Sequence, residues 1–336
     1  MTANKILLDH GSGGRASHEL IEKIFMPSFQ NPLLADLNDS AVLELGGARL
    51  AFTTDSYVVD PIFFPGGDIG SLAVCGTVND LAMRGAIPHY LSAGFILEEG
   101  FPLADLDQIL RSMAKRAEEA GVQIVTGDTK VVPKGMADKL FINTSGIGLI
   151  PEGVNVAGQN ARPGDAVLIS GTIGDHGLTI LSKREGLSFD SPLISDAAPL
   201  NHLVREMLQA CPDIHVLRDP TRGGLATTLN EIARQSAVGI ELWEETIPLR
   251  ESVLAASELL GLDPYYIANE GKLVALMPAP EAQKVMKVIK QNPYGQDAAL
   301  IGEVKGENPG KVVLKTVIGG RRLLDMLTGE QLPRIC

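Results

Sequence analysis

Apolar and polar residues follow one another along the first half of the chain in short segments that favour either strands or helices. Apolar or alternating runs predict strands at 48–54, 88–97, 122–126 and 140–150. Helical spacing of apolar residues predicts helices at 16–25, 69–84 and 103–120. The last of these has the clearest apolar face, and Gly121 directly after it is typical of a helix end.

The same succession resumes after Pro151-Glu152-Gly153, which resembles a boundary between domains. Strands are predicted at 166–170, 216–218, 239–243, 272–277, 299–304 and 311–317. One helix is predicted to follow residue 177, and another follows Gly224 and ends at about residue 235. Two more helices are predicted at 251–260 and 280–291. Strands that interleave with helices indicate helix-covered sheets, and therefore an α/β or α+β fold. We expect an N-terminal domain at 1–152, a C-terminal α/β domain at 153–318 and a tail at 319–336.

The tail has no long apolar period and ends in Pro333-Arg334-Ile335-Cys336. Leu332 precedes a proline and is therefore biased toward extended backbone. A flexible tail of about 16 residues could reach roughly 50 Å. Cys336 is then either a mobile carrier of a small group or simply the last residue of a frayed terminus.

Composition narrows the classes of function. The 336 residues carry a net charge of −12, which argues against nucleic acid as a partner and means that an anionic substrate needs a bridging cation. The three cysteines form no Cys-x-x-Cys pair, as expected in a reducing compartment. The first residues do not resemble a signal peptide, and no apolar run approaches the ~20 residues of a membrane span. We therefore expect a cytoplasmic protein that contacts no membrane.

Two N-terminal segments carry candidate chemistry. Residues 9–14 read Asp-His-Gly-Ser-Gly-Gly before a predicted helix, so their backbone N–H groups could meet a phosphate, or the glycines could simply form a turn. The helix predicted at 69–84 is apolar nearly all round and is expected to be buried. Asp80 within it is costly unless it is paired or binds a metal, although an aspartate hydrogen-bonded near a helix end is equally compatible.

Four aspartates together suggest a cation site. Asp55, Asp128 and Asp219 each come directly after a predicted strand, and site residues gather at strand ends in helix-covered sheets. With Asp80 they would form a carboxylate cluster that repels itself unless a cation neutralises it. Oxygen ligands favour Mg²⁺, which in such sites usually bridges to substrate phosphates. No histidines and cysteines have the spacing of a zinc site.

Seven motifs carry a resemblance to a known family. They are His10-Gly11-Ser12-Gly13-Gly14, Thr53-Thr54-Asp55-Ser56-Tyr57, Val78-Asn79-Asp80-Leu81-Ala82, Gly127-Asp128-Thr129-Lys130-Val131-Val132, Arg218-Asp219-Pro220-Thr221-Arg222-Gly223-Gly224, Ala268-Asn269-Glu270-Gly271-Lys272 and Pro333-Arg334-Ile335-Cys336. Together they resemble the HypE family of hydrogenase maturation proteins over the full length. The internal motifs alone indicate the wider PurM-like superfamily of aminoimidazole ribonucleotide synthetase, and the terminal Pro-Arg-Ile-Cys singles out HypE.

The resemblance implies a two-domain fold whose N-terminal mixed sheets pair in a barrel at a homodimer interface, with ATP and Mg²⁺ bound between the domains. The implied reaction is ATP-dependent dehydration of S-carbamoyl Cys336 to a thiocyanate. The partner carbamoyltransferase HypF would load the carbamoyl group. The HypC–HypD scaffold would receive cyanide for the iron of [NiFe]-hydrogenase.

The resemblance also implies roles for individual residues. Asp55, Asp80 and Asp219 would hold Mg²⁺, with Asp128 as a less certain fourth ligand at the nucleotide. His10, Gly11, Ser12, Gly13 and Gly14 would shield the phosphates. Cys336 would be the carrier, Lys130 would stabilise charge on the transferring group, and Glu270 would be the base. Without the resemblance, Lys130 and Glu270 would be interpreted as members of ordinary ion pairs.

Two other classes of protein remain as alternatives. Selenophosphate synthetase carries a reactive cysteine or selenocysteine near its N-terminus, whereas residues 1–30 here contain no cysteine. A non-catalytic scaffold that uses the tail as a docking peptide would work without the sulfur of Cys336.

Overall fold

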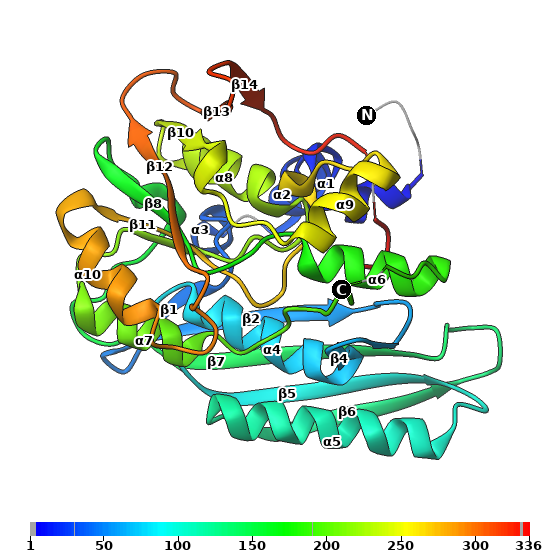
Figure 1. Ribbon diagram of the computed structural model, residues 1–336. Helices are drawn as coiled ribbons and strands as arrows, with labels where there is room; N and C mark the ends of the chain where they lie inside the picture. Colours follow the sequence, from blue (N-terminus) through cyan, green and yellow to red (C-terminus); the bar gives the residue numbers. More distant parts are fainter. Residues whose placement is uncertain (1–4, 30, 190, 330–331) are drawn as a thin grey trace.

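The computed structural model describes residues 5–29, 31–189, 191–329 and 332–336. Within them the chain builds two large sheets, one from residues 41–149 and one from residues 165–324. Figure 1 shows the first sheet and its helices in the lower half of the view and the second sheet in the upper half. This mixed α/β architecture confirms the expected fold class, whereas the domain boundaries at 152 and 318 stay predictions.

The N-terminal sheet has the strand order β1-β2-β7-β5-β6. Its strands are β1 (Ala41–Leu45), β2 (Ala48–Tyr57), β5 (Ile87–Glu98), β6 (Gln123–Val132) and β7 (Leu140–Leu149). Neighbouring strands are antiparallel except β5 and β6, which are parallel. A short hairpin of β3 (Phe63–Phe64) and β4 (Gly67–Asp68) precedes α4 (Ile69–Ala82).

Helix α4 is the centre of the molecule. The carboxylate of Asp68 accepts a hydrogen bond from Ser71 N at 2.8 Å and caps its start. Thirteen of its fourteen residues are buried, and Asp80 is the exception. The helix packs on β2 and β7 and contacts α7 (Asn201–Ala210) of the C-terminal half. The buried helix predicted at 69–84 is therefore confirmed.

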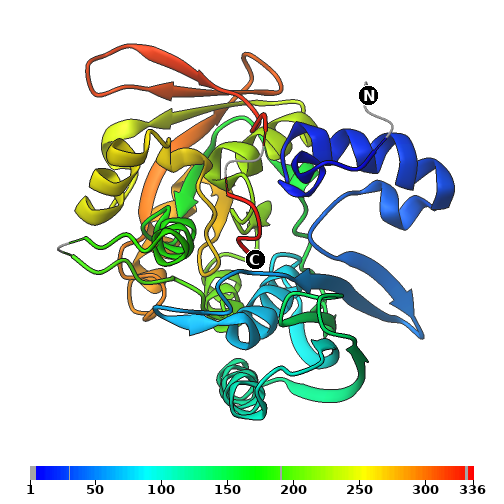
Figure 2. The ribbon, with the colours of Figure 1, turned by 90° about the vertical axis from the view of Figure 1, so that its right-hand side faces the viewer.

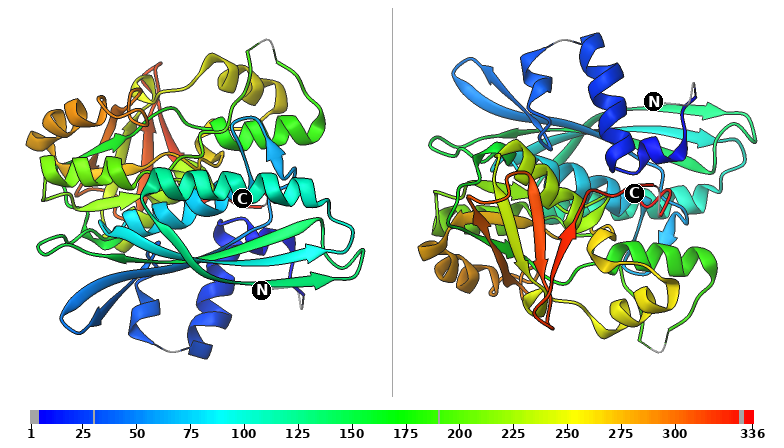
Figure 3. Two further views of the ribbon diagram at one scale, coloured as in Figure 1. Left: turned by 90° about the horizontal axis from the view of Figure 1, so that it is seen from below. Right: turned by 90° about the horizontal axis from the view of Figure 1, so that it is seen from above.

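One face of the N-terminal sheet is covered and the other is open. Helices α4 and α5 (Leu103–Ala120) lie side by side on the covered face, as the left view of Figure 3 shows. Helix α5 buries Ile109, Met113 and Ala117, and it ends at Gly121 in the left-handed conformation (φ +70°). The opposite face and β6 leave large apolar side chains exposed: Phe52, Tyr90, Ile96, Ile124, Val125, Val131 and Leu149.

The C-terminal sheet has the order β14-β13-β10-β12-β8-β11-β9. Its strands are β8 (Asp165–Ile169), β9 (Val216–Arg218), β10 (Gly239–Trp243), β11 (Val274–Pro278), β12 (Ala299–Lys305), β13 (Lys311–Lys315) and β14 (Arg321–Leu324). Besides α7, its helices are α6 (Asp175–Glu185), α8 (Gly224–Gln235), α9 (Glu251–Leu260) and α10 (Ala279–Ile289). Single 3₁₀ turns occur at Gly158–Asn160, Glu244–Thr246 and Pro264–Tyr266.

An N-terminal arm and the tail lie against these two halves. The arm comprises the 3₁₀ turn η1 (Leu8–Gly11), α1 (Arg15–Leu20), the π-helical turn η2 (Ile21–Phe25), α2 (Met26–Phe29) and α3 (Pro32–Ala35). Figure 2 shows the carboxyl terminus ending between the arm, the N-terminal sheet and the C-terminal half. Leu332 and Ile335 belong to the same hydrophobic cluster as Leu72 of α4 and Leu178 of α6.

The structure corrects two expectations about strand ends. Asp55 lies inside β2, and Asp128 lies inside β6, so neither follows its strand. Strand β6 continues past Gly127 because its backbone pairs in parallel with β5 up to Val132. Asp219 does follow β9, as predicted. Residues 321–324, which the sequence analysis places in the tail, form β14 and pair with β13.

Candidate active site

A cavity of about 260 Å³ lies between the two halves of the chain. It is reached by β2, α4, the turn after β9, the loop before β11, the arm and the tail. Its lining includes five predicted site residues that are far apart in the sequence: Asp55, Asp80, Asp219, Glu270 and Cys336. The fold thus collects most of the predicted chemistry at one place.

Asp55 and Asp80 approach the cavity from the N-terminal half. Asp80 Oδ2 accepts a hydrogen bond from Thr53 Oγ1 at 2.9 Å, which fixes its carboxylate beside β2. Burial raises the pKa of Asp80 well above its ordinary value, and the negative charges of Asp219 and Asp55 raise it further. Burial likewise raises the pKa of Asp55, against the opposing charge of Arg222. Both carboxyl groups are therefore costly to ionise without a cation.

Asp219 approaches the cavity from the turn after β9. Burial, followed by the charge of Asp39, raises the pKa of Asp219 to about 8. Asp39 forms an ion pair with Arg218 at 2.8 Å, and Arg218 also pairs with Glu231 on α8 at 2.5 Å. Arg218 is thus paired with Asp39 and Glu231. Asp219 lines the cavity near the two other acids, Asp55 and Asp80.

Glu270 lies on the loop between α9 and β11 and is 3% exposed. Its Oε1 atom is buried and has no hydrogen-bond partner among the residues that the structure describes. Burial raises the pKa of Glu270 well above its ordinary value, and the charge of Asp219 adds to the shift. Its backbone is fixed on both sides, because Asn79 Nδ2 donates to Glu270 O at 3.1 Å and Glu270 N donates to Asp196 Oδ1 at 3.1 Å. A buried carboxylate oxygen without a hydrogen-bond partner, on a rigid loop, indicates a group that binds a ligand or a proton.

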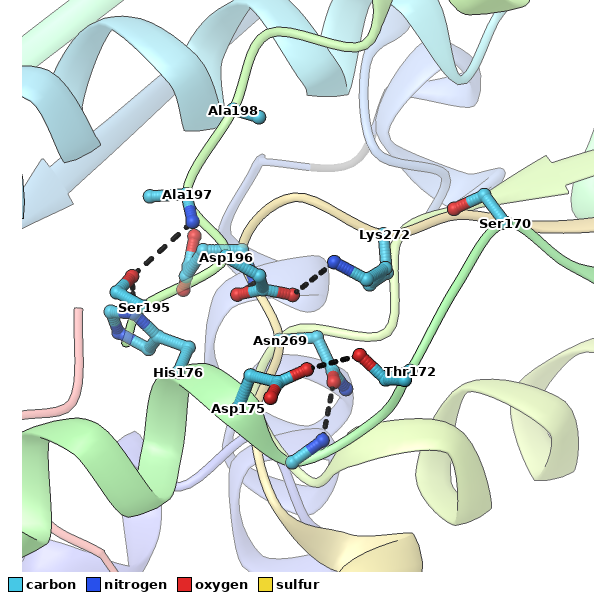
Figure 4. Close-up of polar contacts among 12 residues, drawn as sticks. Ser170, Thr172, Asp175, His176, Ser195, Asp196, Ala197, Ala198, Asn269 and Lys272 are labelled. Atoms are coloured by element: carbon cyan, nitrogen blue, oxygen red, sulfur yellow. Dashed lines mark hydrogen bonds and ion pairs between the residues drawn. The ribbon is translucent and has the colours of Figure 1, made fainter. Parts of the chain in front are cut away.

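A second polar cluster supports this loop from below. Figure 4 shows Lys272 Nζ paired with Asp196 Oδ2, at 3.2 Å, and Ser195 between Ala197 and His176. Asn269 Oδ1 accepts from Gly174 N at 2.8 Å, which connects the loop to the start of α6. The nearby charge of Lys272 holds the pKa of Asp196 below its ordinary value despite burial.

The tail brings Cys336 into the cavity. Val58 N donates to Cys336 O at 2.9 Å and Asp60 N donates to Arg334 O at 3.2 Å, so the tip runs along the end of β2. The charge of Cys336 is the largest cause of the raised pKa of Arg222, and Arg222 also lines the cavity. A guanidinium beside a thiol favours the reactive thiolate.

The glycine-rich segment reaches the cavity only through Gly13. Arg222 Nη1 donates to Gly11 O at 3.1 Å, so the segment rests on the turn after β9. The N–H groups of Gly13 and Gly14 donate to the hydroxyl groups of Ser17 and Ser12. His10 accepts from Leu7 N through Nδ1 at 2.9 Å and does not line the cavity. To bind a phosphate, the N–H groups of Gly13 and Gly14 would therefore have to release these hydroxyl groups.

Lys130 and Asp128 lie elsewhere. They form an exposed ion pair on β6, with N–O distances of 2.6 and 2.9 Å, and their side chains are 68% and 67% exposed. Both point to the open face of the N-terminal sheet, because they pair across β5 with Ile96 and Gly94. The exposed Lys130 beside Asp128 holds the pKa of Asp128 below its ordinary value. Within one chain, the structure does not bring these two residues to the cavity.

Sequence reasoning missed four charged residues of the cavity: Asp39, Arg218, Arg222 and Glu231. The two arginines flank Asp219 in a motif that we quoted only for its aspartate. Glu231 gives no local signal on α8, and Asp39 gives none before β1, because their ion pairs are made across the fold.

The donor set of the cavity suits a hard divalent cation that also binds phosphate. Every candidate ligand is a carboxylate oxygen, and the acids raise one another's pKa, so a cation would relieve their repulsion. Over the described ranges, no three carboxylate, imidazole or thiol groups already stand together at metal-binding positions. A Mg²⁺ ion that takes few protein ligands and completes its shell with phosphate oxygens and water fits such a site.

Fold and sequence together define a protein of the PurM-like class. The family models of the AIR synthase related proteins match residues 37–150 with the N-terminal domain and residues 162–315 with the C-terminal domain. The carbamoyl dehydratase HypE of Azotobacter vinelandii is 57% identical over 327 residues, which cover 97% of this chain and 96% of that protein.

Two solved structures have the same fold. HypE in complex with ATP is 57% identical, with a TM-score of 0.84 over 99% of this chain and 100% of that chain. HypE from the HypE–HypF complex is 52% identical, with a TM-score of 0.88 over 92% of this chain and 99% of that chain. The chain belongs to the HypE family of carbamoyl dehydratases, and the resemblance found in the sequence is confirmed. No helix of the described chain combines the length and apolarity needed to cross a bilayer.

Proposed function

We propose that this chain uses ATP to dehydrate a carbamoyl group carried on its own Cys336, and that the S-cyanocysteine formed supplies cyanide to the iron of [NiFe]-hydrogenase. The observation that carries the proposal is the position of Cys336, which lines the same cavity as Asp55, Asp80, Asp219 and Glu270. The relatives named carbamoyl dehydratase and the ATP complex of HypE support it.

The reaction requires a better leaving group than oxide. In S-carbamoyl cysteine, S–C(=O)–NH₂, the carbonyl oxygen attacks the γ-phosphorus of ATP and ADP leaves. The C–O bond then breaks with its electron pair, phosphate departs, and the nitrogen loses both protons as the C≡N bond forms. The net change is the loss of one water from the carbamoyl group, matched by hydrolysis of ATP to ADP and phosphate.

The residues of the cavity fit roles in this sequence. Asp55, Asp80 and Asp219 would hold Mg²⁺, which neutralises charge on the transferring phosphoryl group. Glu270 lines the same cavity, which supports the proposal that it takes a nitrogen proton. A carboxylate whose pKa is raised binds a proton more firmly than an ordinary one, which suits a base in a buried site. Arg222 would balance the charge on the sulfur side.

We also propose that the chain acts as a homodimer paired through the open face of the N-terminal sheets. The exposed apolar residues of that face, such as Phe52 and Tyr90, support the pairing. Lys130 and Asp128 lie on this face, so they can serve the nucleotide or the transferring group only at a site that a second chain completes. Their assignment to the reaction stays a proposal.

The remaining partners follow from the carrier role. A HypF-type carbamoyltransferase would load Cys336, and the HypE–HypF complex supports this partner. A HypC–HypD scaffold would accept the cyano group. Both steps require the tip of the tail, with Cys336, to leave the cavity, so its docked position would be one of at least two. A cytoplasmic location fits such partners.

Mass spectrometry of the carboxyl-terminal peptide tests the proposal. The protein is incubated with the HypF-type enzyme, carbamoyl phosphate and ATP, and then with Mg²⁺–ATP alone. We expect the carbamoyl mass on Cys336, followed by the loss of one water. Cys336→Ser is the control and should keep nucleotide binding but gain no mass. A carbamoylated peptide that never loses water, despite ATP binding, would disprove the enzyme function and favour a scaffold.

A further inference from the structure

The body of the protein contacts the docked tail at the main-chain oxygen atoms of four consecutive residues. Arg184 on α6 donates to Pro333 O at 2.7 Å and to Arg334 O at 2.8 Å. His176 Nε2 lies 2.8 Å from Ile335 O. Val58 N donates to Cys336 O. The body thus forms a hydrogen bond to the main-chain oxygen of each of the last four residues.

His176 is the most constrained of these groups. Its side chain is completely buried in the first turn of α6, and Phe64 meets its ring edge to face at 5.6 Å. Its second nitrogen, Nδ1, lies 2.8 Å from Ser195 Oγ. Ser195 Oγ in turn accepts a hydrogen bond from Ala197 N at 3.2 Å, and Figure 4 shows this chain of contacts.

The partners determine where the imidazole proton lies. A carbonyl oxygen only accepts, so the hydrogen bond to Ile335 O requires the proton on Nε2. In the neutral ring, Nδ1 is then an acceptor, and the hydroxyl group of Ser195 donates a hydrogen bond to it. Burial lowers the pKa of His176, which agrees with a neutral ring. The hydrogen bonds therefore all run in one direction: Ala197 N donates to Ser195 Oγ, which donates to His176 Nδ1, and His176 Nε2 donates to Ile335 O.

The segment that orients His176 also orients the loop of the proposed base. Ser195 is followed by Asp196, whose carboxylate accepts from Glu270 N at 3.1 Å and pairs with Lys272 at 3.2 Å. One segment thus sets both the tail, through His176, and the backbone of Glu270. Cys336 and Glu270 are therefore both positioned through contacts with two adjacent residues, Ser195 and Asp196.

We propose that His176 is a positioning residue for the reaction at Cys336: its Nε2–H holds the tail in the cavity through Ile335 O, and Ser195 fixes the tautomer that makes this possible. The inference rests on the proposed function, because it concerns the step that takes place while the tail is docked. It predicts a separation of the two half-reactions. Loading by the HypF-type enzyme needs the tail outside, whereas dehydration needs it docked.

Three variants separate the hydrogen bond from packing. His176→Phe removes the donor and keeps a ring, and His176→Gln restores an N–H donor for Ile335 O. His202→Phe is the matched control, because His202 Nε2 also meets a backbone carbonyl, Glu119 O at 3.1 Å, but far from the tail on α7. The full-length chain is used throughout.

The first readout needs no activity. A maleimide attached to a polyethylene glycol chain is too large to enter the cavity, so docking, which leaves Cys336 half-buried, slows its modification. Cys75 and Cys211 are buried and remain protected. Loss of one buried hydrogen bond shifts such an equilibrium by roughly tenfold, so His176→Phe should raise the modification rate by that factor. His176→Gln and His202→Phe should stay near the wild-type rate.

The second readout is single-turnover chemistry on carbamoylated protein. His176→Phe should slow the ATP-dependent loss of water and leave the loading rate unchanged, and His176→Gln should recover both rates. Unchanged modification and dehydration in His176→Phe would overturn the inference, as would equal effects in His202→Phe, a defect that glutamine does not repair, or a parallel loss of loading. If wild-type protein never loses water, the proposed function fails, while the maleimide rates still test the docking role by themselves.

Discussion

The carboxylates of the cavity predict that Asp219→Asn stabilises the metal-free protein at neutral pH. Burial and the charge of Asp39 raise the pKa of Asp219 to about 8. An unfolded aspartate has a pKa near ~3.9. Between these two values the folded protein keeps a proton that the unfolded chain has lost, so the free energy of unfolding falls as the pH rises through this window. Asparagine does not titrate, so the variant does not lose this part of its unfolding free energy as the pH rises.

The size of the effect follows from the linkage of protons to folding. One group in this window contributes a slope of about 1.4 kcal/mol per pH unit. From pH 5 to pH 7, wild-type protein should therefore lose up to about 3 kcal/mol more of its unfolding free energy than Asp219→Asn. The variant also relieves Asp80 and Glu270, whose raised pKa values both include the charge of Asp219.

Urea unfolding at pH 5 and pH 7, in the presence of a chelator, measures this difference. Asp107→Asn is the control, because Asp107 lies exposed on α5 in an ion pair with Arg111. In a second measurement, Mg²⁺–ATP should stabilise the wild type by about 2.7 kcal/mol at a hundredfold excess over its dissociation constant, and should stabilise Asp219→Asn much less. Equal pH slopes for variant and wild type, or full stabilisation of the variant by Mg²⁺–ATP, would refute the reasoning.

Three further predictions concern the arm, the open face and the tail. Gly14→Ala should cost about 1–3 kcal/mol of unfolding free energy and weaken ATP-dependent stabilisation, because its Cβ would collide with Leu327 O, whereas Gly11→Ala meets no atom within 4 Å and should be neutral in the same thermal assay. Lys130→Met should change the unfolding free energy by less than about 1 kcal/mol, since its ion pair is exposed, and yet abolish ATP-dependent dehydration; normal turnover would contradict its assignment. Arg184→Met should increase the maleimide reactivity of Cys336 because two tail carbonyls lose their donor, while Arg111→Met on the surface of α5 should leave it unchanged.

The elements that the sequence predicted well are those whose pattern is local. Helix α5 was predicted at its observed bounds because its apolar face and Gly121 both lie within the segment. Strand β6 was predicted too short, because Gly127-Asp128 looks like a turn, and only pairing with β5 carries the strand through it. Helix α7 and strand β14 were not predicted: α7 packs on α4 and α10, which are distant in sequence, whereas β14 pairs with the neighbouring strand β13.

The same distinction holds for the site. Asp55, Asp80, Asp219 and Glu270 were found through motifs, and the fold brings them to one cavity. The pairing of Asp39 with Arg218 could not be predicted, because it joins the residues before β1 to the end of β9. Nor could the tail's docked position, which depends on His176 and Arg184 of a helix that has no recognisable motif for it.

Because the tail and its dock belong to one chain, binding between them is intramolecular. A short covalent tether gives the group at its tip an effective concentration roughly in the millimolar range. A dock that combines hydrogen bonds to main-chain oxygen atoms with the burial of Leu332 and Ile335 then needs only a modest intrinsic affinity to be filled most of the time and still released quickly. Tight binding would trap the thiol, so a weak grip on a tethered peptide is the arrangement that suits a carrier with several destinations.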